Sequence, residues 1–303
     1  MRIIISGGFG HIGASLIKQL IKIKKIKKIL VIDNFVGEKV YPLFSIKNKK
    51  IKVLYEDLTT YQLDKHLNYD LFIHLAAITN AEKSFEAKNM IEKNYDITKK
   101  VVNFCKKNKI KLIFPSSTSV YGTSKRIVFE NDNSTLNPQS PYAKIKIKEE
   151  NLIKKYQKDL KFLIFRLGTI YGFSEGIRFH TAINKFCFLA AFNKELTIWK
   201  KNFNQYRPYL CLNDFVRLVI SIINKEINIK YNDTYNVLTH NFRLNQIVDI
   251  LRGIKPNIKI KFVKSPLINQ KTYLVSNEKI KKTTFRFTGN LEKSIIKTLN
   301  KLI

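Results

Sequence analysis

The sequence predicts an α/β fold, in which a doubly wound parallel sheet covered by helices is followed by a smaller α/β domain. Short apolar runs alternate with amphipathic stretches through the first half of the chain, as strands and crossover helices do. A chain with only 11 glycines also places four of them between Gly7 and Gly13, directly after the first apolar run. We therefore expect residues 1–171 to form the sheet domain and residues 172–303 mostly the second, with segments near 207–240 returning to the first.

The first expected strand is Ile3–Ile5, and the first expected helix covers residues 12–25, where Ile12, Leu16 and Leu20 recur near the helical period. Two longer amphipathic stretches predict helices over residues 84–107 and 141–157. After about residue 172 the regular alternation breaks into short elements and turns. The other apolar runs predict strands at Ile29–Ile32, Ile51–Tyr55, Leu71–Leu75, Leu112–Phe114 and Phe162–Arg166.

Composition excludes several classes of protein. A hydrophobic content of 45% rules out a disordered polymer. The longest purely apolar run, Phe186–Phe192, is far shorter than the roughly 20 residues of a membrane-spanning helix. The first residues lack the apolar region of a secretory signal, and Cys105, Cys187 and Cys211 lack metal-ligand spacing. We therefore expect a cytoplasmic protein with reduced thiols, no bound metal and no membrane insertion.

The net charge of +32, from 55 Lys and Arg against 23 Asp and Glu, raises the question of nucleic-acid binding. The lysines are spread along the whole chain, often alternating with isoleucine as in Ile21–Lys28, and form no basic tail or stripe with interleaved aromatic residues. We interpret them as solvated faces and expect no specific nucleic-acid partner. The positive field would still attract a small anionic substrate.

The glycine-rich turn is the first functional motif. Gly7, Gly10 and Gly13 follow a strand and open a helix. The first would permit the tight turn, the second the approach of a pyrophosphate, and the third close packing of helix on strand. The next strand ends in Asp33, whose carboxylate would bind ribose hydroxyls and repel a 2′-phosphate. Together these features predict a Rossmann-type domain that binds NAD in preference to NADP.

The second motif begins at the end of the fifth strand with Ser117. Tyr142 and Lys146 are four residues apart on the next helix and therefore share one face. A lysine ammonium beside a phenol stabilises the phenolate and lowers the pKa of the phenol from its usual value near 10. With a serine hydroxyl to hold the substrate oxygen, such a group would abstract a proton from an alcohol while NAD accepts a hydride. A tyrosine and lysine at this spacing are common on surface helices, so the interpretation depends on the preceding glycine turn and acid.

These motifs make the sequence resemble the extended short-chain dehydrogenase/reductase family, specifically its NAD-dependent nucleotide-sugar epimerase/dehydratase group. The resemblance runs almost end to end. It rests on Gly7–Gly13, Asp33-Asn34, Asp57-Leu58, His74–Ala77, Asn94, Ser117 with Val120–Gly122, Tyr142 with Lys146, Arg166–Gly172, Arg207–Leu210 with Asp214, Tyr235–Val237 and Tyr273–Ile280.

The family implies a role for each matching position. Tyr142 would be the base, Lys146 would also hold the nicotinamide ribose, and Ser117 would bind the reacting oxygen. A homodimer is common in the family and is expected here. The NAD contacts would be Gly7, Gly10, His11, Ile12, Gly13, Asp33, Asn34, Asp57, Leu58, Leu75, Ala76, Ala77, Thr79, Asn94, Tyr142 and Lys146. Contacts to a nucleotide-diphosphate sugar would be Ser117, Thr118, Thr169, Arg178, His180 and Arg207, with Arg207 at the diphosphate. His180 is included for its position alone, as an extra acid/base group or a phosphate contact, and a lone histidine is more often neither.

Departures from the family's patterns narrow the expected reaction. Dehydratases of this kind usually carry Asp-Glu where this chain has Thr118-Ser119, so elimination of water lacks its usual acid and base. Decarboxylating relatives have Glu, and the GDP-fucose synthase type has Cys, at the position of Ser119. We therefore expect 4-epimerisation of a nucleotide sugar through a transient 4-keto sugar. Thr169 replaces an Asn that often touches substrate, which leaves the identity of the sugar open.

Four other functions stay open at this point. A nucleotide-sugar 4-dehydrogenase or 4-keto reductase would need the same residues, and a dehydratase is disfavoured by Thr118-Ser119. A catalytically silent dinucleotide-binding protein would have no need of Ser117, Tyr142 and Lys146 together. A polyanion-binding protein would lose nucleic-acid affinity steeply with salt.

Overall fold

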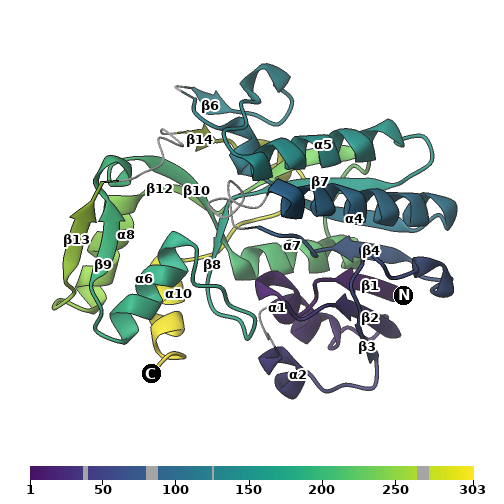
Figure 1. The fold of residues 1–303 in the computed structure, drawn as a ribbon, viewed down its shortest axis with the longest axis horizontal. Helices are drawn as coiled ribbons and strands as arrows, with labels where there is room; N and C mark the ends of the chain where they lie inside the picture. The colour runs from purple at the N-terminus through teal and green to yellow at the C-terminus, as the bar shows by residue number, and fades with distance from the viewer. Residues whose placement is uncertain (37–39, 80–87, 125, 265–272) are drawn as a thin grey trace.

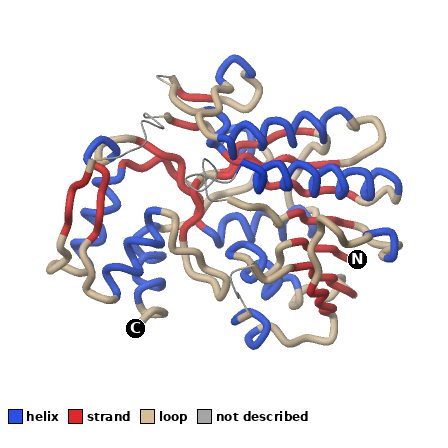
Figure 2. The backbone as a smooth tube through the Cα atoms, viewed as in Figure 1, coloured by secondary structure: helices blue, strands red, loops and turns tan. Residues whose placement is uncertain are grey.

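The computed structural model describes residues 1–36, 40–79, 88–124, 126–264 and 273–303. A seven-stranded sheet, parallel throughout, forms its centre (Figures 1 and 2). The strands are β1 (Arg2–Ser6), β2 (Lys28–Asp33), β3 (Ile51–Tyr55), β4 (Leu71–His74), β5 (Lys111–Ser117), β7 (Phe162–Leu167) and β11 (Asp233–Val237). Their order across the sheet is β11-β7-β5-β4-β1-β2-β3.

Helices cover both faces of this sheet. On one face α1 (His11–Leu20) and α7 (Leu212–Asn224) pack against Ile3 and Ile5, and on the other α4 (Lys88–Lys107) and α5 (Pro141–Lys155) enclose the cluster that contains Ile4. The alternation along β1 follows from the two-residue repeat of a strand. The expected α/β fold with a doubly wound parallel sheet is confirmed. Because the strand order reverses between β1 and β4, a crevice for a ligand is expected at the carboxyl ends of these two strands.

The expected elements of the first half are present, with shifted ends. The helix expected over 12–25 ends at Leu20, because the chain turns there and buries Ile26 in the core. The helix expected over 84–107 begins at Lys88 in the structure, and residues 84–87 lie outside the described part. Strand β5 continues past Phe114 to Ser117, which pairs with Leu167 of β7. Helix α2 (Tyr41–Ser45) was not expected.

The remaining elements form smaller units beside the main sheet, on the left of Figure 1 for the most part. They are a sheet of β8 (Thr169–Tyr171), β10 (Tyr206–Cys211) and β12 (His240–Arg243), the pair β9 (Leu196–Trp199) and β13 (Ile260–Val263), the pair β6 (Ile127–Val128) and β14 (Leu274–Val275), the helices α6 (Ala182–Ala191), α8 (Leu244–Ile254), α9 (Glu278–Lys281) and α10 (Leu291–Leu299), and the short turns η1 (Leu63–Lys65), η2 (Thr118–Tyr121), η3 (Asn133–Thr135) and η4 (Lys200–Asn202).

The segment 207–240 links the two parts of the molecule. Strand β10 belongs to the three-stranded sheet, and the chain then enters α7 under the main sheet and β11 at its edge. That this segment returns to the first domain stays a prediction. The domain boundary between residues 171 and 172 stays a prediction.

No helix in the described ranges is long and apolar enough to cross a membrane. Among the same residues, no group of three or more His, Cys, Asp or Glu side chains could hold a metal ion. The three cysteines are free and buried, and burial raises the pKa of the Cys187 thiol to about 12.

Candidate active site

The glycine-rich turn lies between the end of β1 and the start of α1, at the carboxyl ends of β1 and β4, the region that is called the crevice below. Gly7 has a φ of +66°, and a Cβ on it would lie 2.6 Å from the backbone nitrogen of Ala76, so only glycine fits. Gly13, in the first turn of α1, packs against the backbone of Gly8. Gly10 is the N-cap of α1, and no side chain hydrogen-bonds there. The first N–H groups of the helix, together with its positive dipole end, therefore suit a phosphate group.

The Asp33 carboxylate lies beside this turn at the end of β2. Oδ2 accepts a 2.9 Å hydrogen bond from the backbone N–H of Phe9, and Oδ1 accepts one of the same length from Phe35. The Phe9 and Phe35 rings are stacked, with centroids 5.3 Å apart. Asp33 thus holds the glycine turn in place, and a carboxylate has lone pairs left for ribose hydroxyls.

Asn34 and Asp57 meet next to Asp33. The Asn34 amide donates to Asp57 Oδ2 over 3.1 Å. Partial burial acts to raise the pKa of Asp57, but hydrogen bonds from Thr59 and Asn34 outweigh it, so the pKa lies below its usual value. Asp57 is therefore an anionic acceptor near neutral pH. The side chain of Leu58 is buried in the core instead, so any contact from Leu58 to a cofactor would have to come from its backbone.

The segment after β4 forms the other wall of the crevice. Leu75, Ala76, Ala77 and Thr79 are half-buried there. Asn94 of α4 is buried beneath the segment, where its amide accepts from the Ile78 N–H (2.9 Å) and donates to the Ile78 carbonyl (3.0 Å). The structure thus places Asn94 as a support for the wall.

Residues 172–178 pack directly on the glycine turn, a contact that the sequence analysis did not foresee. A Cβ on Gly176 would lie 2.5 Å from the carbonyl oxygens of Phe9 and Gly10. His11 Nε2 hydrogen-bonds to the Gly172 carbonyl (2.7 Å), and the Ser174 hydroxyl donates to the His11 carbonyl (2.7 Å). His11 is therefore buried against this segment, whereas the neighbouring Ile12 is half-buried. Gly172 and Gly176 lie close together in a chain with few glycines, and this spacing could have indicated the contact from the sequence.

Ser117, Tyr142 and Lys146 converge at the same crevice. Ser140 caps α5 by accepting a hydrogen bond from the Ala143 N–H, which places Tyr142 and Lys146 in the first two turns. The Tyr142 hydroxyl hydrogen-bonds to the Ser117 side chain, and the Ser119 hydroxyl donates to Ser117 Oγ over 2.9 Å. Ser116 instead donates to Glu150 on α5. Lys146 Nζ lies 5.8 Å from the centre of the Tyr142 ring.

Burial and the neighbouring charges shift the pKa of the Tyr142 phenol in opposite directions. Burial raises the pKa of Tyr142, and the nearby Lys146 and Arg178 lower it without cancelling the effect of burial. Burial likewise acts to lower the pKa of Lys146, but Glu149 and Tyr142 outweigh it, so the pKa lies above its usual value. Lys146 is therefore a cation beside a phenol whose pKa lies above its usual value, although Lys146 itself acts to lower that pKa as the sequence predicted.

The residues expected to bind substrate are spread over a wider area. Thr118 is buried, donates its hydroxyl to the Leu167 carbonyl (3.1 Å) and hydrogen-bonds to Tyr273. The Arg207 guanidinium lies 5.3 Å from the centre of the same Tyr273 ring. Tyr273 is therefore a further candidate for the substrate side, although the sequence analysis named it only as part of the family resemblance. Thr169 opens β8 and is half-buried.

Arg178 and His180 follow the segment that covers the glycine turn. Arg178 donates to the Thr79 hydroxyl over 2.6 Å and lies near Asp33 and Tyr142. Arg178 therefore lies between the glycine turn and the Tyr142 phenol. His180 is exposed.

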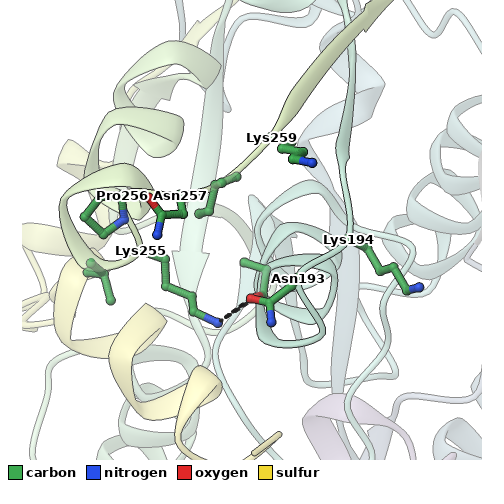
Figure 3. A pocket seen from close by; sticks show the side chains of 9 residues that line it. Asn193, Lys194, Lys255, Pro256, Asn257 and Lys259 are labelled. Atoms are coloured by element: carbon green, nitrogen blue, oxygen red, sulfur yellow. Dashed lines mark hydrogen bonds between the residues drawn. The ribbon is translucent and has the colours of Figure 1, made fainter.

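A separate surface pocket lies between the turn after α6 and the turn after α8 (Figure 3). Lys255 Nζ crosses it to the Asn193 side-chain oxygen (3.3 Å) and the Ala190 carbonyl (2.9 Å). None of the expected site residues lines this pocket, so we place the candidate active site at the crevice. The lining residues are Ala190, Asn193, Lys194, Ile254, Lys255, Pro256, Asn257, Ile258 and Lys259.

Comparisons with known proteins add independent findings. Residues 3–237 match the model of the NAD dependent epimerase/dehydratase family. An uncharacterized UDP-glucose epimerase of Bacillus subtilis, YtcB, is 29% identical over 239 residues, which cover 74% of this chain and 73% of that protein. The dTDP-D-glucose 4,6-dehydratase of Dictyostelium discoideum is 33% identical over 259 residues, which cover 76% of this chain and 57% of the relative.

Among solved structures, the UDP-glucuronic acid 4-epimerase from Bacillus cereus, in complex with UDP-glucuronic acid and NAD, superposes with a TM-score of 0.90. It is 25% identical, and the match covers 100% of this chain and 99% of that one.

Proposed function

Because the chain belongs to the NAD dependent epimerase/dehydratase family, we propose that it is a nucleotide-sugar 4-epimerase. It would oxidise the sugar at C4 to a transient ketone and reduce that ketone from the opposite face. The observation that carries the proposal is the convergence of Ser117, Tyr142 and Lys146 beside the glycine turn, with the neutral Thr118-Ser119 next to them.

The family match confirms the resemblance that the sequence indicated. It also confirms the prediction of an enzyme that depends on NAD. The Bacillus cereus structure contains NAD, which supports the same cofactor. The more specific statements, namely the reaction at C4 and the role of each residue, are proposals.

The crevice fits NAD. The glycine turn and the N-terminus of α1 would hold the pyrophosphate, Asp33 the adenosine ribose, and Lys146 the nicotinamide ribose. Gly10, the N-cap of α1, has no side-chain hydrogen bond to the first N–H groups of the helix, which supports this placement. A Cβ on Gly10 would lie 3.3 Å from Gly7 O and 3.5 Å from Arg178 Nη2, so the Arg178 guanidinium lies beside the turn. When bound, NAD supplies a hydride acceptor for the oxidation and a donor for the reduction.

The side chains of this chain would move the proton. The Ser117 hydroxyl would hold the C4 oxygen while Tyr142 Oη accepts the proton of the C4 hydroxyl. Lys146, charged throughout, would stabilise the phenolate. In the second half of the reaction Tyr142 would return the proton to the oxygen of the re-reduced carbon. No further acid or base is needed, which agrees with the neutral pair Thr118-Ser119.

We propose a UDP-sugar as the first substrate class to test, since the curated epimerase relative and the solved epimerase both carry UDP-sugar names. Arg207, stacked on Tyr273, would bind the diphosphate. Arg178 is a second cation near the phenol and would contact the sugar or its phosphates.

Two alternatives have specific support. A relative that is 33% identical is a 4,6-dehydratase, but Thr118 and Ser119 offer no carboxylate for the elimination. A 4-keto reductase would use the same Ser117, Tyr142 and Lys146 but would consume added NADH.

A cytoplasmic homodimer is also part of the proposal. The three free, buried thiols fit a reducing compartment. Light scattering after size-exclusion chromatography would measure the mass, and a monomer at working concentration would contradict the dimer.

The experiment that tests the proposed function is incubation of the protein with a panel of UDP-, dTDP-, GDP- and CDP-sugars, with and without added NADH. We expect one sugar nucleotide to form its C4 epimer without net consumption of added cofactor. Stoichiometric consumption of NADH would indicate a reductase, and loss of water from the sugar would indicate a dehydratase.

A further inference from the structure

Two consecutive carboxylates of α5, Glu149 and Glu150, are each only 1% exposed. Glu150 pairs with Arg166. Glu149 lies one helical turn from Lys146, and its Oε2 is 3.0 Å from Lys146 Nζ, which is itself buried. The proposed mechanism assigns a role to Lys146 and none to its buried counter-ion.

The other oxygen of Glu149 ends a chain of hydrogen bonds. The Thr98 hydroxyl of α4 donates to Glu149 Oε1 over 2.5 Å. Its single hydrogen is thereby used, so Thr98 must accept from His74 Nε2, 3.2 Å away. His74 is then the Nε2–H tautomer, and its Nδ1 accepts from the Ser6 hydroxyl at 2.7 Å.

This chain reaches the wall of the cofactor crevice. The backbone N–H of Ala76 donates to Ser6 Oγ over 3.4 Å, which is a long bond. Burial lowers the pKa of His74 to about 3, so the imidazole is neutral at working pH. The donors of these hydrogen bonds therefore all point toward Glu149, whose other oxygen faces the Lys146 ammonium.

The charges that face Tyr142 come from three directions. On its own helix are Lys146, Glu149 and, beyond Lys146, Glu150; from residues 172–178 comes Arg178; and Ser117 of β5 supplies a hydroxyl. His74 of β4 faces Lys146 but is neutral. Lys146 and Arg178 favour the phenolate of Tyr142, whereas Glu149 is the carboxylate that opposes it.

We propose that Glu149 is a positioning residue that holds the Lys146 ammonium in place and sets the pH at which Tyr142 releases its proton. The proposal rests on the proposed function for the role of Tyr142 as base. A buried ammonium with no counter-ion would be costly and would have no fixed orientation. With Glu149 present, Lys146 stays charged and in a fixed orientation, but its effect on the phenol is partly neutralised.

The test is a direct titration of Tyr142 in the NAD-bound protein. Tyrosine labelled with ¹³C at Cζ reports ionisation by NMR, and the signal that disappears in Tyr142→Phe assigns the residue. We expect Glu149→Gln to lower the pKa of Tyr142 by about one unit, because a negative charge near the phenol is removed. An unchanged pKa of Tyr142 in the folded variant would overturn the proposal.

Asp159→Asn is the matched control, since Asp159 is an exposed acid just beyond α5 and its replacement removes the same charge. It should leave the titration of Tyr142 unchanged, and an equal shift would show a non-specific charge effect and overturn the proposal. If Glu149→Gln does not fold, Glu149→Met keeps the volume without the charge, and the same downward shift is expected. A folded Glu149→Met protein with an unchanged Tyr142 pKa would refute the role of the charge.

A kinetic readout separates this inference from the proposed function. In Glu149→Gln the acid limb of the kcat/KM profile should move to lower pH by about the same one unit. If the parent turns over no sugar nucleotide but the NMR shift is present, the proposed function fails and the role of Glu149 in setting the acidity of Tyr142 stands. If the parent is active and neither the NMR titration nor the acid limb moves, only the inference fails.

Discussion

Two buried polar networks begin at neighbouring residues of α5 and run to different parts of the molecule. From Glu149 one network leads to Lys146 and Tyr142 at the crevice, and through Thr98 to His74. From Glu150 the other leads to Arg166 and on to Tyr121 and Asn236. Both carboxylates are equally buried.

The networks differ in how completely their groups are satisfied. Arg166, fully buried, donates to Glu150 through Nε (3.0 Å) and Nη2 (2.7 Å) and to the Tyr121 hydroxyl through Nη1 (2.9 Å). The Tyr121 hydroxyl donates a hydrogen bond to the Asn236 side-chain oxygen, and the Asn236 amide in turn donates to Glu130. In the Glu150 network Arg166 has both Glu150 and Tyr121 as partners, and Lys154 joins from a more exposed position. The Glu149 network ends at Lys146, whose Nζ lies 5.8 Å from the centre of the half-buried Tyr142 ring. Burial alone therefore does not show whether a carboxylate has a structural or a functional role. That role depends on the group to which its network leads.

The pKa directions follow the same division. Burial acts to raise the pKa of Glu150, but the bonds from Arg166 outweigh it and the pKa falls below its usual value. For Tyr142, burial prevails and the pKa is raised. The Glu150 network stabilises a fixed charge, and the Glu149 network leads to a phenol whose proton can be moved.

The largest expected effect comes from removing the reactive end of the Glu149 network. Tyr142→Phe should lower kcat by about 10³-fold or more, because the proton acceptor is lost, while the affinity for NAD stays within a few-fold. Steady-state kinetics and a fluorescence titration with NADH would measure both. Activity within tenfold of the parent would contradict the assignment of Tyr142 as the base.

Breaking the closed network should affect stability instead. Glu150→Gln leaves the buried Arg166 without a counter-charge and should lower the free energy of unfolding by about 3–5 kcal/mol, measured by urea titration. Lys154→Gln is the control, because Lys154 pairs with the same Glu150 from a more exposed position and should cost less than about 1 kcal/mol. Equal losses in the two variants would show that the ion pair of Glu150 with Arg166 stabilises the fold no more than the pair with Lys154.

A smaller effect is expected on the cofactor side of the crevice. Asp33→Ala removes the acceptor for ribose hydroxyls and the support of the Phe9 N–H, so NAD should bind about 10- to 100-fold more weakly. Affinity for NADP should change less, since the carboxylate repels a 2′-phosphate. Equal affinity of the parent for both dinucleotides would count against this role.

The smallest effect concerns pH and His74. Because the pKa of His74 in the folded protein is about 3, well below its usual 6.5, the unfolded chain binds a proton first as the pH falls. The stability is full above pH 6.5 and is lost as the pH falls toward 3. From pH 6.5 to 5.5 the parent should lose about 1 kcal/mol more than His74→Asn. Urea titrations at the two pH values would measure the free energy of unfolding, and an equal loss in the parent and in His74→Asn would refute this.

Most of the main sheet could be predicted from the sequence, because each strand is an apolar run and each crossover helix has its own periodicity. The small units could not. Strand β9 pairs with β13, and β6 with β14, across long stretches of chain and over few residues, so no local pattern specifies them. The five-residue helix α2 is likewise too short to show a period.

The candidate site could be predicted in part. The spacing of the glycines and of Tyr142 with Lys146 follows from local geometry, which is why these residues could be named. Glu149 lies in a run of charges that is typical of a solvated face, and only the packing of α5 against α4 buries it with Thr98. Gly176 and Tyr273 similarly depend on contacts between distant parts of the chain.

The central claim is that the hydrogen removed from C4 returns to C4 from the other face. A sugar nucleotide that is a substrate in the panel, deuterated at C4, tests it most directly by NMR and mass spectrometry of the product. We predict that the epimer keeps the deuterium at C4 without added cofactor. Deuterium that is lost to solvent or added NADH, or found on another carbon, would contradict the account.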